Sequence, residues 1–486
     1  MANYYDGLLE LCGFEQGEID EERPRIEETF KRLGIGPDDM EAADSWVRQN
    51  HEISLMGVRK LLGAWIKEMI DAVLARDEGK KPVYYGFPAI LGPALVLSAS
   101  SDDVFAAAPD VTLIHVMGQI FNKLSPIIEA GEANGAPPGH ALCSIWQAKI
   151  GGLVKGIIPP PSLNISSGYF CDMSAVGDAL VNYKYGTPSV NIDGSMDGMY
   201  GEYPKIREER VAFFGAQINN ALKKAEKILD VRITPDAMEK GTQNVQEFRS
   251  RLARLIELMK ADPVPLSLAA LDHLEALPGA STARGIREGI KAMDILIPEL
   301  EERVKAGIGA AKKGAPRVSM PHAHMSDPRC CNVMEDVGLA VPVTYVLVWM
   351  GGIPLRVDKV YPTIGENIAA NELLSGMVFG GDASHERIVQ TVKIMKLDGF
   401  IMKNLFNCRA VAGASRIEKK HLEEALGIPV LSLEEDLVDT RTYSADYVRS
   451  RVETYAEMLK ARKAWEAADT YEDEAPPPAA AVTTSA

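Results

Sequence analysis

Two cysteines lie directly after predicted strands and directly before predicted helices. Cys171 follows a short apolar segment in LNISSGYFC, and Cys408 has the same setting in GFIMKNLFNCRAVAG. In open parallel sheets, ligands bind at the edge formed by the carboxyl ends of the strands. A helix N-terminus also favours a thiolate over a thiol. Both cysteines are therefore candidates for metal binding or catalysis.

A third cysteine, Cys143, lies in the Pro/Gly-containing loop APPGHALC, which enters another predicted helix. This loop could meet the same crevice. The long separations between the three cysteines match neither a C-x-x-C pair nor a ferredoxin run. Free cysteine is often simply buried. The spacing alone thus leaves both metal ligation and ordinary burial open.

The other thiols and two histidines are weaker candidates. Cys330 and Cys331 are adjacent, so their side chains diverge, and we predict a buried pair on a helix. Cys12 lies in a predicted N-terminal helix and is expected in the core. His322 and His324 follow a predicted strand and could bind a metal or act in acid–base catalysis. The alternative is a pair of loop histidines that face water.

Several familiar catalytic motifs are absent from the sequence. It contains no G-x-x-x-x-G-K-[ST] nucleotide loop, so we expect no ATP site, and it has neither a G-x-S-x-G nor an H-E-x-x-H segment. The acidic segment LEEDLVDTR follows the last predicted strand. It could be a solvated strand end that caps the final helix, or it could be catalytic.

The pattern of apolar residues predicts an α/β fold with two sheet domains. Residues 1–80 show helical spacing and predict an N-terminal helical cap. Strands alternating with helices predict a first α/β domain over residues 81–233, which carries Cys143 and Cys171. The first predicted strand of this domain begins at Pro82. The other three cover residues 111–116, 163–166 and 188–193.

The remainder of the chain repeats this layout. Residues 234–314 predict a helical connector, and residues 315–468 a second α/β domain that carries Cys408 and ends in a closing helix. Its strands are predicted at 316–321, 341–349, 399–405 and 428–436. We expect both domains to contain doubly wound, Rossmann- or flavodoxin-like parallel sheets. The tail, residues 469–486, has no core-forming pattern and is predicted to be disordered.

The composition excludes some classes of function. The chain has 52 Lys and Arg against 68 Asp and Glu, with no basic cluster, which argues against nucleic-acid binding. No apolar run is long enough to span a bilayer, and the N-terminus has no secretory pattern. We therefore expect no membrane association and a cytoplasmic location. Six cysteines in 486 residues do not suggest a disulfide scaffold.

The C-terminal segment from DGFIMKNLFNC to RVETYAEML resembles one known family. It is similar to the C-terminal block of 2-hydroxyacyl-CoA dehydratase and benzoyl-CoA reductase subunits. That block contains a strand, a cysteine, a helix, a G-I-P strand, a D-x-x-D-x-R turn and a final helix. The corresponding residues here are Cys408, Gly427, Ile428, Pro429, Asp436, Asp439, Arg441, Arg451, Val452 and Glu453. Residues 82–193 resemble the family's first α/β domain more loosely, with Cys143 and Cys171 at its first two cluster positions.

The resemblance implies one oxygen-sensitive 4Fe–4S cluster, held by Cys143, Cys171 and Cys408. Three ligands leave one iron without a protein ligand, and an open iron can act as a Lewis acid. In the family, a thioester carbonyl accepts one electron and becomes a ketyl radical anion. A 2-hydroxyacyl-CoA then loses water to give an enoyl-CoA, whereas the reductases reduce the ring of benzoyl-CoA.

The resemblance also implies partners. The electron comes from a separate ATP-hydrolysing iron–sulfur activator, which fits the missing ATP motif, and related subunits work in pairs, as a homodimer or a heterodimer. A dehydratase subunit is the leading hypothesis, and a benzoyl-CoA-reductase-type subunit is the second. The third is a non-enzymatic two-domain protein that closes on a small molecule.

Overall fold

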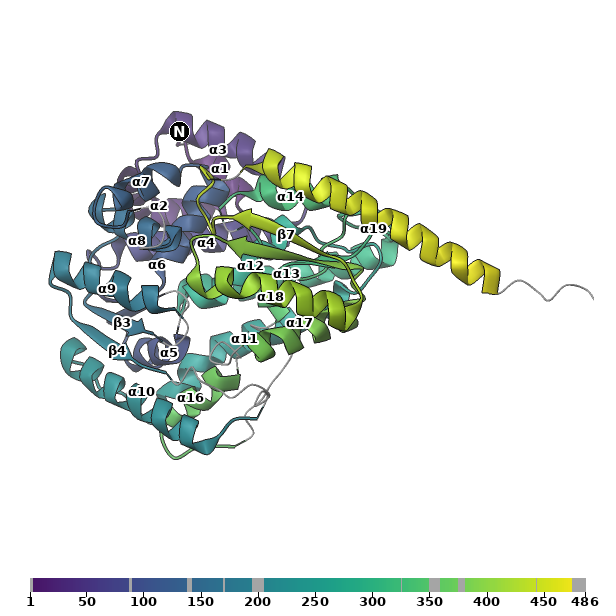
Figure 1. Ribbon diagram of the computed structural model, residues 1–486. Coiled ribbons are helices and arrows are strands. Elements are labelled where there is room, and N and C mark those ends of the chain that lie inside the picture. Colours follow the sequence, from purple (N-terminus) through teal and green to yellow (C-terminus); the bar gives the residue numbers. More distant parts are fainter. Residues whose placement is uncertain are drawn as a thin grey trace, which may run out of the picture.

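Two parallel sheets surrounded by helices form the molecule (Figure 1), which confirms the predicted α/β class. The computed structural model describes residues 3–86, 90–137, 142–168, 171–194, 205–324, 326–348, 359–374, 381–442 and 444–473.

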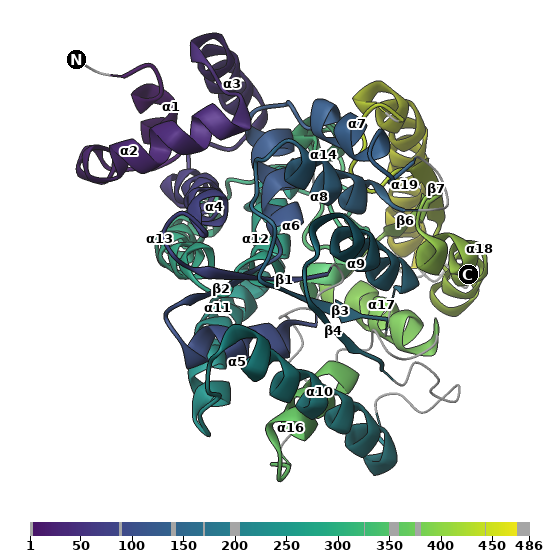
Figure 2. The ribbon, with the colours of Figure 1, turned by 90° about the vertical axis from the view of Figure 1, so that its left-hand side faces the viewer.

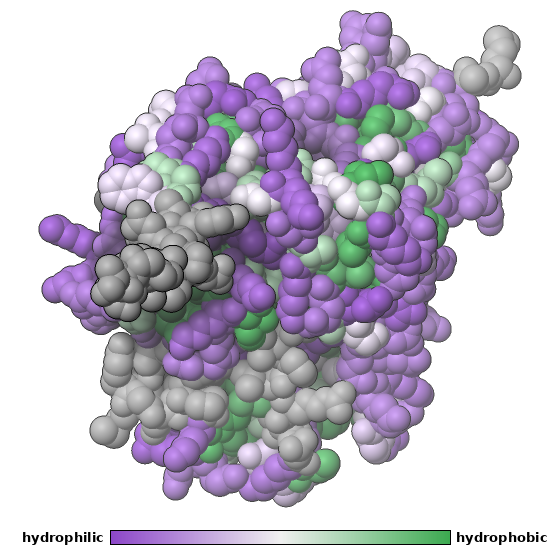
Figure 3. Space-filling view, turned by 90° about the vertical axis from the view of Figure 1, so that its right-hand side faces the viewer, coloured by the Kyte–Doolittle hydropathy of each residue, from purple (hydrophilic) through white to green (hydrophobic). Residues whose placement is uncertain are grey.

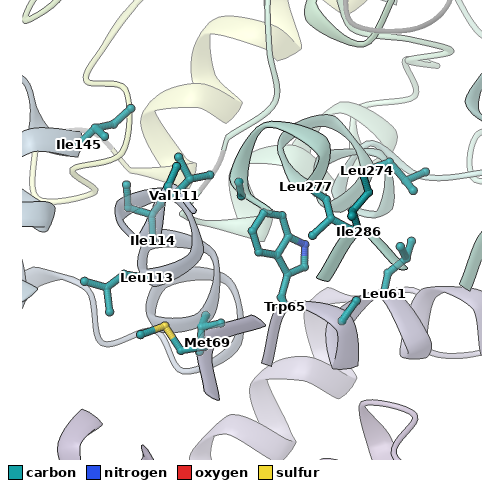
Figure 4. Close-up of a cluster of buried hydrophobic side chains, with 14 of the residues drawn as sticks. Leu61, Trp65, Met69, Val111, Leu113, Ile114, Ile145, Leu274, Leu277 and Ile286 are labelled. Carbon is teal, nitrogen blue, oxygen red and sulfur yellow. The ribbon is translucent and has the colours of Figure 1, made fainter. Parts of the chain in front are cut away.

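The N-terminal region is helical, as predicted. It comprises α1 (Asp6–Leu11), α2 (Gln16–Leu33), α3 (Pro37–Asn50) and α4 (Met56–Leu74). Helix α4 is buried along most of its length and packs against α13 (Arg284–Ala306). Trp65 of α4 lies at the centre of a cluster of apolar side chains that joins the N-terminal helices to the rest of the molecule (Figure 4).

The first sheet has four parallel strands in the order β2 (Val104–Ala107), β1 (Lys81–Tyr85), β3 (Leu163–Ser167) and β4 (Ser189–Ile192). Helices α8 (Ser144–Val154) and α9 (Asp172–Tyr185) lie on one side of it (Figure 2). Helices α5 (Leu91–Ser100) and α10 (Glu208–Leu229) lie on the other side. Because helices cover both faces, β1, β2 and β3 are buried almost continuously rather than at alternate residues.

The strand predicted at residues 111–116 is wrong. These residues belong to α6 (Pro109–Ile114) and to the π-helix η1 (His115–Ile120), and every residue of both is buried. A helix that is buried all round has no polar face, so its 3.6-residue period is invisible in the sequence. The strand of this region, β2, ends just before α6 begins.

The connecting region is helical, as expected. It contains α11 (Ala237–Leu258), α12 (Leu268–Ala280) and α13, while α7 (Ser125–Glu132) lies earlier in the chain and packs against α8.

The second sheet has three parallel strands in the order β5 (Val318–Ser319), β6 (Gly399–Leu405) and β7 (Val430–Glu435). Helix α18 (Arg409–Leu426) packs against β6 and β7. On the opposite side lie α14 (Pro328–Asp336) and α19 (Ala445–Asp473) (Figure 1). The remaining helices are α15 (Tyr345–Leu347), α16 (Ile364–Leu374) and α17 (Gly381–Met395).

The prediction of a strand at residues 341–349 is also wrong for residues 341–348, which the structure describes. Residues 341–344 are not in a strand, and Thr344 caps α15 by accepting a hydrogen bond from the Leu347 amide at 3.2 Å. Residue 349 lies outside the described residues. The apolar, β-branched composition of this segment reflects its burial rather than pairing in a sheet.

The C-terminal helix is longer than expected, because α19 continues to Asp473. The predicted tail therefore does not begin at residue 469, and residues 474–486 lie outside the described part. The domain boundaries given above stay predictions. Within the described residues, no helix is both long and apolar enough to cross a membrane. The face in Figure 3 is mainly hydrophilic, with small separate apolar areas.

Candidate functional site

Cys143, Cys171 and Cys408 share one structural position, the N-cap of a helix. They precede α8, α9 and α18, respectively. In each case the cysteine has extended backbone geometry and its carbonyl accepts a hydrogen bond from the helix that follows. The first amides of a helix have no partner inside that helix. Such positions stabilise negative charge on sulfur.

The three cysteines are close enough to interact electrostatically. Burial raises the pKa of the Cys143 thiol to about 12, and negative charge on Cys171 or Cys408 would raise it further. The backbone N–H groups of Trp146 and Ile145 act in the opposite direction and lower this pKa. The structure therefore brings together two cysteines that follow strands of different sheets and a third that follows a loop.

This arrangement differs from a site for a single ion. The described part of the chain contains no group of three His, Cys, Asp or Glu side chains placed to hold one metal ion. Ligands of one ion all lie within about 2.3 Å of it. Cysteines that hold an iron–sulfur cluster bind different irons and stand farther apart. All six cysteines lie among the described residues, and none is in a disulfide.

A buried carboxylate links the residues next to two of the cysteines. Asp436, after β7, accepts hydrogen bonds from the Ser144 hydroxyl and from the Asn407 side-chain amide. Asn407 Nδ2 also lies 3.4 Å from Ser144 Oγ. All three side chains are buried. Ser144 follows Cys143 and Asn407 precedes Cys408, so this network joins the two cysteine segments.

The acidic segment after β7 has a structural role that both interpretations of the sequence missed. Asp439 is buried and pairs with Arg441, with Oδ2 and Nη2 2.7 Å apart. Arg441 also pairs with Glu132 of α7, with Nη2 and Oε1 2.6 Å apart. Most of the segment, including Asp436 and Asp439, is thus buried rather than solvated. Through Arg441 and Asp436, it connects the second sheet to α7 and α8.

His324 lies in a buried charged cluster at the second sheet, not in water as the alternative interpretation had it. Its Nδ1 is 3.6 Å from Glu435 Oε2, and Glu435 pairs with Lys403 at 2.9 Å. All three side chains are at most 1% exposed. Burial and the Lys403 charge lower the pKa of both His322, to about 3, and His324. Both imidazoles are therefore neutral at physiological pH, and their catalytic role stays a prediction.

Lys403 and Glu435 were missed from the sequence, although a signal was present. Lys403 is a charged residue inside GFIMKNL, a strand that is otherwise almost wholly buried. Lysine is almost never fully buried without a partner. A lysine inside such a strand therefore indicates a buried carboxylate partner.

A second buried acid, Glu275, lies beside this cluster and predicts a pH effect on stability. Burial and the Asp272 charge raise its pKa to about 8, although Thr344 Oγ1 donates to Glu275 Oε2 at 2.6 Å. The folded-state pKa lies above the ordinary value of 4.5. The contribution of Glu275 to stability is therefore fully present below about pH 4.5 and is lost as the pH rises towards 8.

The substitution Glu275→Gln should remove this loss of stability at higher pH. Between about pH 5 and pH 8, we expect the unfolding free energy of the wild type to fall relative to Glu275→Gln by about 1.4 kcal/mol per pH unit. Urea denaturation at a series of pH values measures this difference. Parallel pH profiles for the two proteins would contradict the assignment. Glu302→Gln is the control, since Glu302 is 74% exposed.

Helices α8 and α9 pack closely behind Cys143 and Cys171. Trp146 of α8 is fully buried, and a Cβ added at Gly177 of α9 would lie 2.1 Å from its ring. Lys149 of α8 places its Nζ 4.3 Å from the Trp146 ring centroid and pairs with Asp178 at 3.2 Å.

Gly177→Ala should therefore displace Trp146 and destabilise the protein by about 1–3 kcal/mol. The unfolding free energy from chemical denaturation measures this effect. Gly413→Ala on α18 is the matched control, because no described atom lies within 4 Å of the position that its new Cβ would take. In a helix, that change should be neutral or stabilising by up to about 1 kcal/mol. Equal effects of both changes would refute the close packing.

The remaining cysteines are packed in the core, as predicted. Cys330 and Cys331 lie on α14 and are fully buried, and so is Cys12 at the end of α1. Burial raises the pKa of all three thiols.

A comparison with known proteins identifies the family of this chain. Residues 107–459 match the family model for 2-hydroxyglutaryl-CoA dehydratase, D-component. This match covers more than half of the chain, which therefore belongs to that family of acyl-CoA dehydratase and reductase subunits.

Individual relatives are distant. The (R)-2-hydroxyglutaryl-CoA dehydratase alpha subunit of Acidaminococcus fermentans is 20% identical over 63% of this chain and 61% of its own length, less than two thirds of that relative. The (R)-phenyllactyl-CoA dehydratase alpha subunit of Clostridium sporogenes is 22% identical over 67% of this chain and 77% of its own length. A benzoyl-CoA reductase subunit of Thauera aromatica is 21% identical over 67% of this chain and 78% of its own length.

Proposed function

We propose that this chain is the iron–sulfur subunit of an oxygen-sensitive enzyme that removes water from a 2-hydroxyacyl-CoA. Cys143, Cys171 and Cys408 would hold one 4Fe–4S cluster. The observation that carries the proposal is the convergence of three helix N-caps, all cysteine, with Cys143 within electrostatic range of both Cys171 and Cys408.

The donor set fits such a cluster. Thiolates are soft ligands suited to iron–sulfur centres. The helix N-termini favour the thiolate form that a metal requires. The raised pKa of Cys143 means that a thiolate there needs a compensating positive charge, which iron would supply.

When bound, the cluster would supply a single electron to the thioester carbonyl of the substrate and an iron with an open position for an oxygen ligand. The chain's own residues would hold the three sulfurs at fixed places. The buried side chains of Trp146, Ser144 and Asn407 would shield them from water. We further propose that each sheet is the core of a doubly wound domain, and that the site faces the crevice between them.

The partners follow from the same proposal. A related subunit and a separate ATP-hydrolysing iron–sulfur activator would complete the enzyme in the cytoplasm. The names of two relatives, as alpha subunits, support the need for a second subunit. The similarity to a benzoyl-CoA reductase subunit supports a second candidate, the ATP-dependent reduction of an aromatic acyl-CoA.

Anaerobic purification tests the proposal. We expect brown protein with about four irons per chain. Colourless, iron-free protein after anaerobic reconstitution would refute it. With activator and partner present, turnover of a 2-hydroxyacyl-CoA rather than benzoyl-CoA identifies the dehydratase, and the opposite preference identifies the reductase.

A further inference from the structure

The carboxylate of Asp436 has four hydrogen-bond donors, which come from three separate parts of the chain. Its Oδ1 accepts from the Ser144 hydroxyl and from the backbone amides of Val438 and Asp439, the last two both at 2.9 Å. Its Oδ2 accepts from Asn407 Nδ2. The two backbone amides fix the carboxylate to its own loop, and the two side chains attach it to the segments of Cys143 and Cys408.

We infer that Asp436 is a positioning residue whose buried carboxylate sets the distance between the loops that carry Cys143 and Cys408. Ser144 is the first residue of α8, so its hydroxyl bond fixes the start of that helix and the N-cap cysteine before it. Asn407 fixes the last residue before Cys408 in the same way. The purpose of this arrangement rests on the proposed function, because a cluster requires its ligands at set positions.

Burial increases the effect of losing any one of these hydrogen bonds. Asp436 is 4% exposed, Ser144 is fully buried and Asn407 is 7% exposed. Water therefore cannot replace the lost partner readily when one member is removed. An outer contact, between Arg441 and Glu132, joins the same parts of the molecule, but Arg441 is 30% exposed. Exposed ion pairs contribute little, so the inner carboxylate should dominate.

Ser144→Ala, Asn407→Ala and Asp436→Ala test the inference. The first readout uses iron-free protein and dibromobimane, a short reagent that joins two nearby thiols. The rate at which the Cys143–Cys408 peptide pair forms, measured by mass spectrometry, reports the distance between the loops. We expect Asp436→Ala to slow this reaction by about tenfold or more, and each single partner change to slow it less.

Circular dichroism shows whether each variant is folded. If Asp436→Ala does not fold, Ser144→Ala and Asn407→Ala still decide the question, because each leaves the other side-chain hydrogen bond to Asp436 in place. Glu132→Gln is the matched control, because it removes the outer pair and leaves the pair of Arg441 with Asp439 intact. It should change the rate by less than about twofold. A wild-type rate in folded Asp436→Ala, or in both partner variants, overturns the inference. A large effect of Glu132→Gln alone also overturns it.

The second readout is the iron bound after anaerobic reconstitution, which should fall in the order wild type, partner variants, Asp436→Ala. Wild-type protein that binds no iron would overturn the proposed function, whereas the cross-linking rates would still test the role of Asp436. The two failures are therefore distinguishable.

Discussion

Cys408→Ser should lose most of the iron that the wild type binds, while its fold survives. Cys408 is the N-cap of α18, and serine is itself a good N-cap residue, so the helix should keep its start. A serine hydroxyl is a much poorer ligand for iron than a thiolate. Iron content and the visible absorption of anaerobically reconstituted protein measure the loss, and circular dichroism measures the fold.

The control for this change is Cys12→Ala, because Cys12 is buried at the end of α1 and lies outside the proposed ligand set. It should leave the iron content unchanged. Full iron in Cys408→Ser would remove Cys408 from the ligand set. Equal loss in both variants would show that the effect is general rather than specific to the site.

Lys403→Met should be among the most destabilising single changes in the molecule. The Lys403 ammonium is fully buried and lies 2.9 Å from Glu435 Oε1. Its removal leaves a buried carboxylate without its charged partner, and the neighbouring His324 is neutral and cannot replace that charge. Removing one partner of a buried pair typically costs about 3–5 kcal/mol of unfolding free energy. Chemical denaturation at neutral pH measures this loss.

Lys420→Met on α18 is the matched control, since Lys420 is 74% exposed and lies 3.8 Å from Glu424. An exposed pair should contribute less than about 1 kcal/mol. The double variant Lys403→Met, Glu435→Gln should recover part of the loss, because it removes the buried charge. Similar stabilities of Lys403→Met and Lys420→Met would show that the buried pair does not contribute as expected.

Local pattern was sufficient for much of the fold and for part of the site. Cys171 and Cys408 were predicted at junctions between a strand and a helix, and the structure confirms both junctions. This works because strand, loop and helix signals all lie within a short segment. The helical N-terminal region was predicted for the same reason, since α4 repeats its apolar residues at helical spacing.

Complete burial is what misled the prediction elsewhere. All residues of α6 and most of those in the segment around Thr344 are buried, so neither segment has the exposed polar face that would reveal a period. β-Branched residues then favour a strand interpretation, although tertiary packing selects a helix. The actual strand β2, VFAA, is short and carries little signal of its own.

The network of Asp436 could not be found from local pattern. Ser144 and Asp436 are separated by 292 positions, and nothing in either segment indicates the other. The resemblance of the C-terminal block drew attention to Asp436, Asp439 and Arg441, but it did not indicate what these side chains contact. Only the folded chain shows that they join α7 and α8 to the second sheet.

This separation has a consequence for biosynthesis. The ribosome must synthesise 292 further positions after Ser144 before its partner Asp436 is available. Contacts of such long range form late in folding, after local helices and hairpins. Maturation of the protein would then follow a fixed order, in which Asp436 is synthesised first, the two sheets dock next, and any prosthetic group is loaded last.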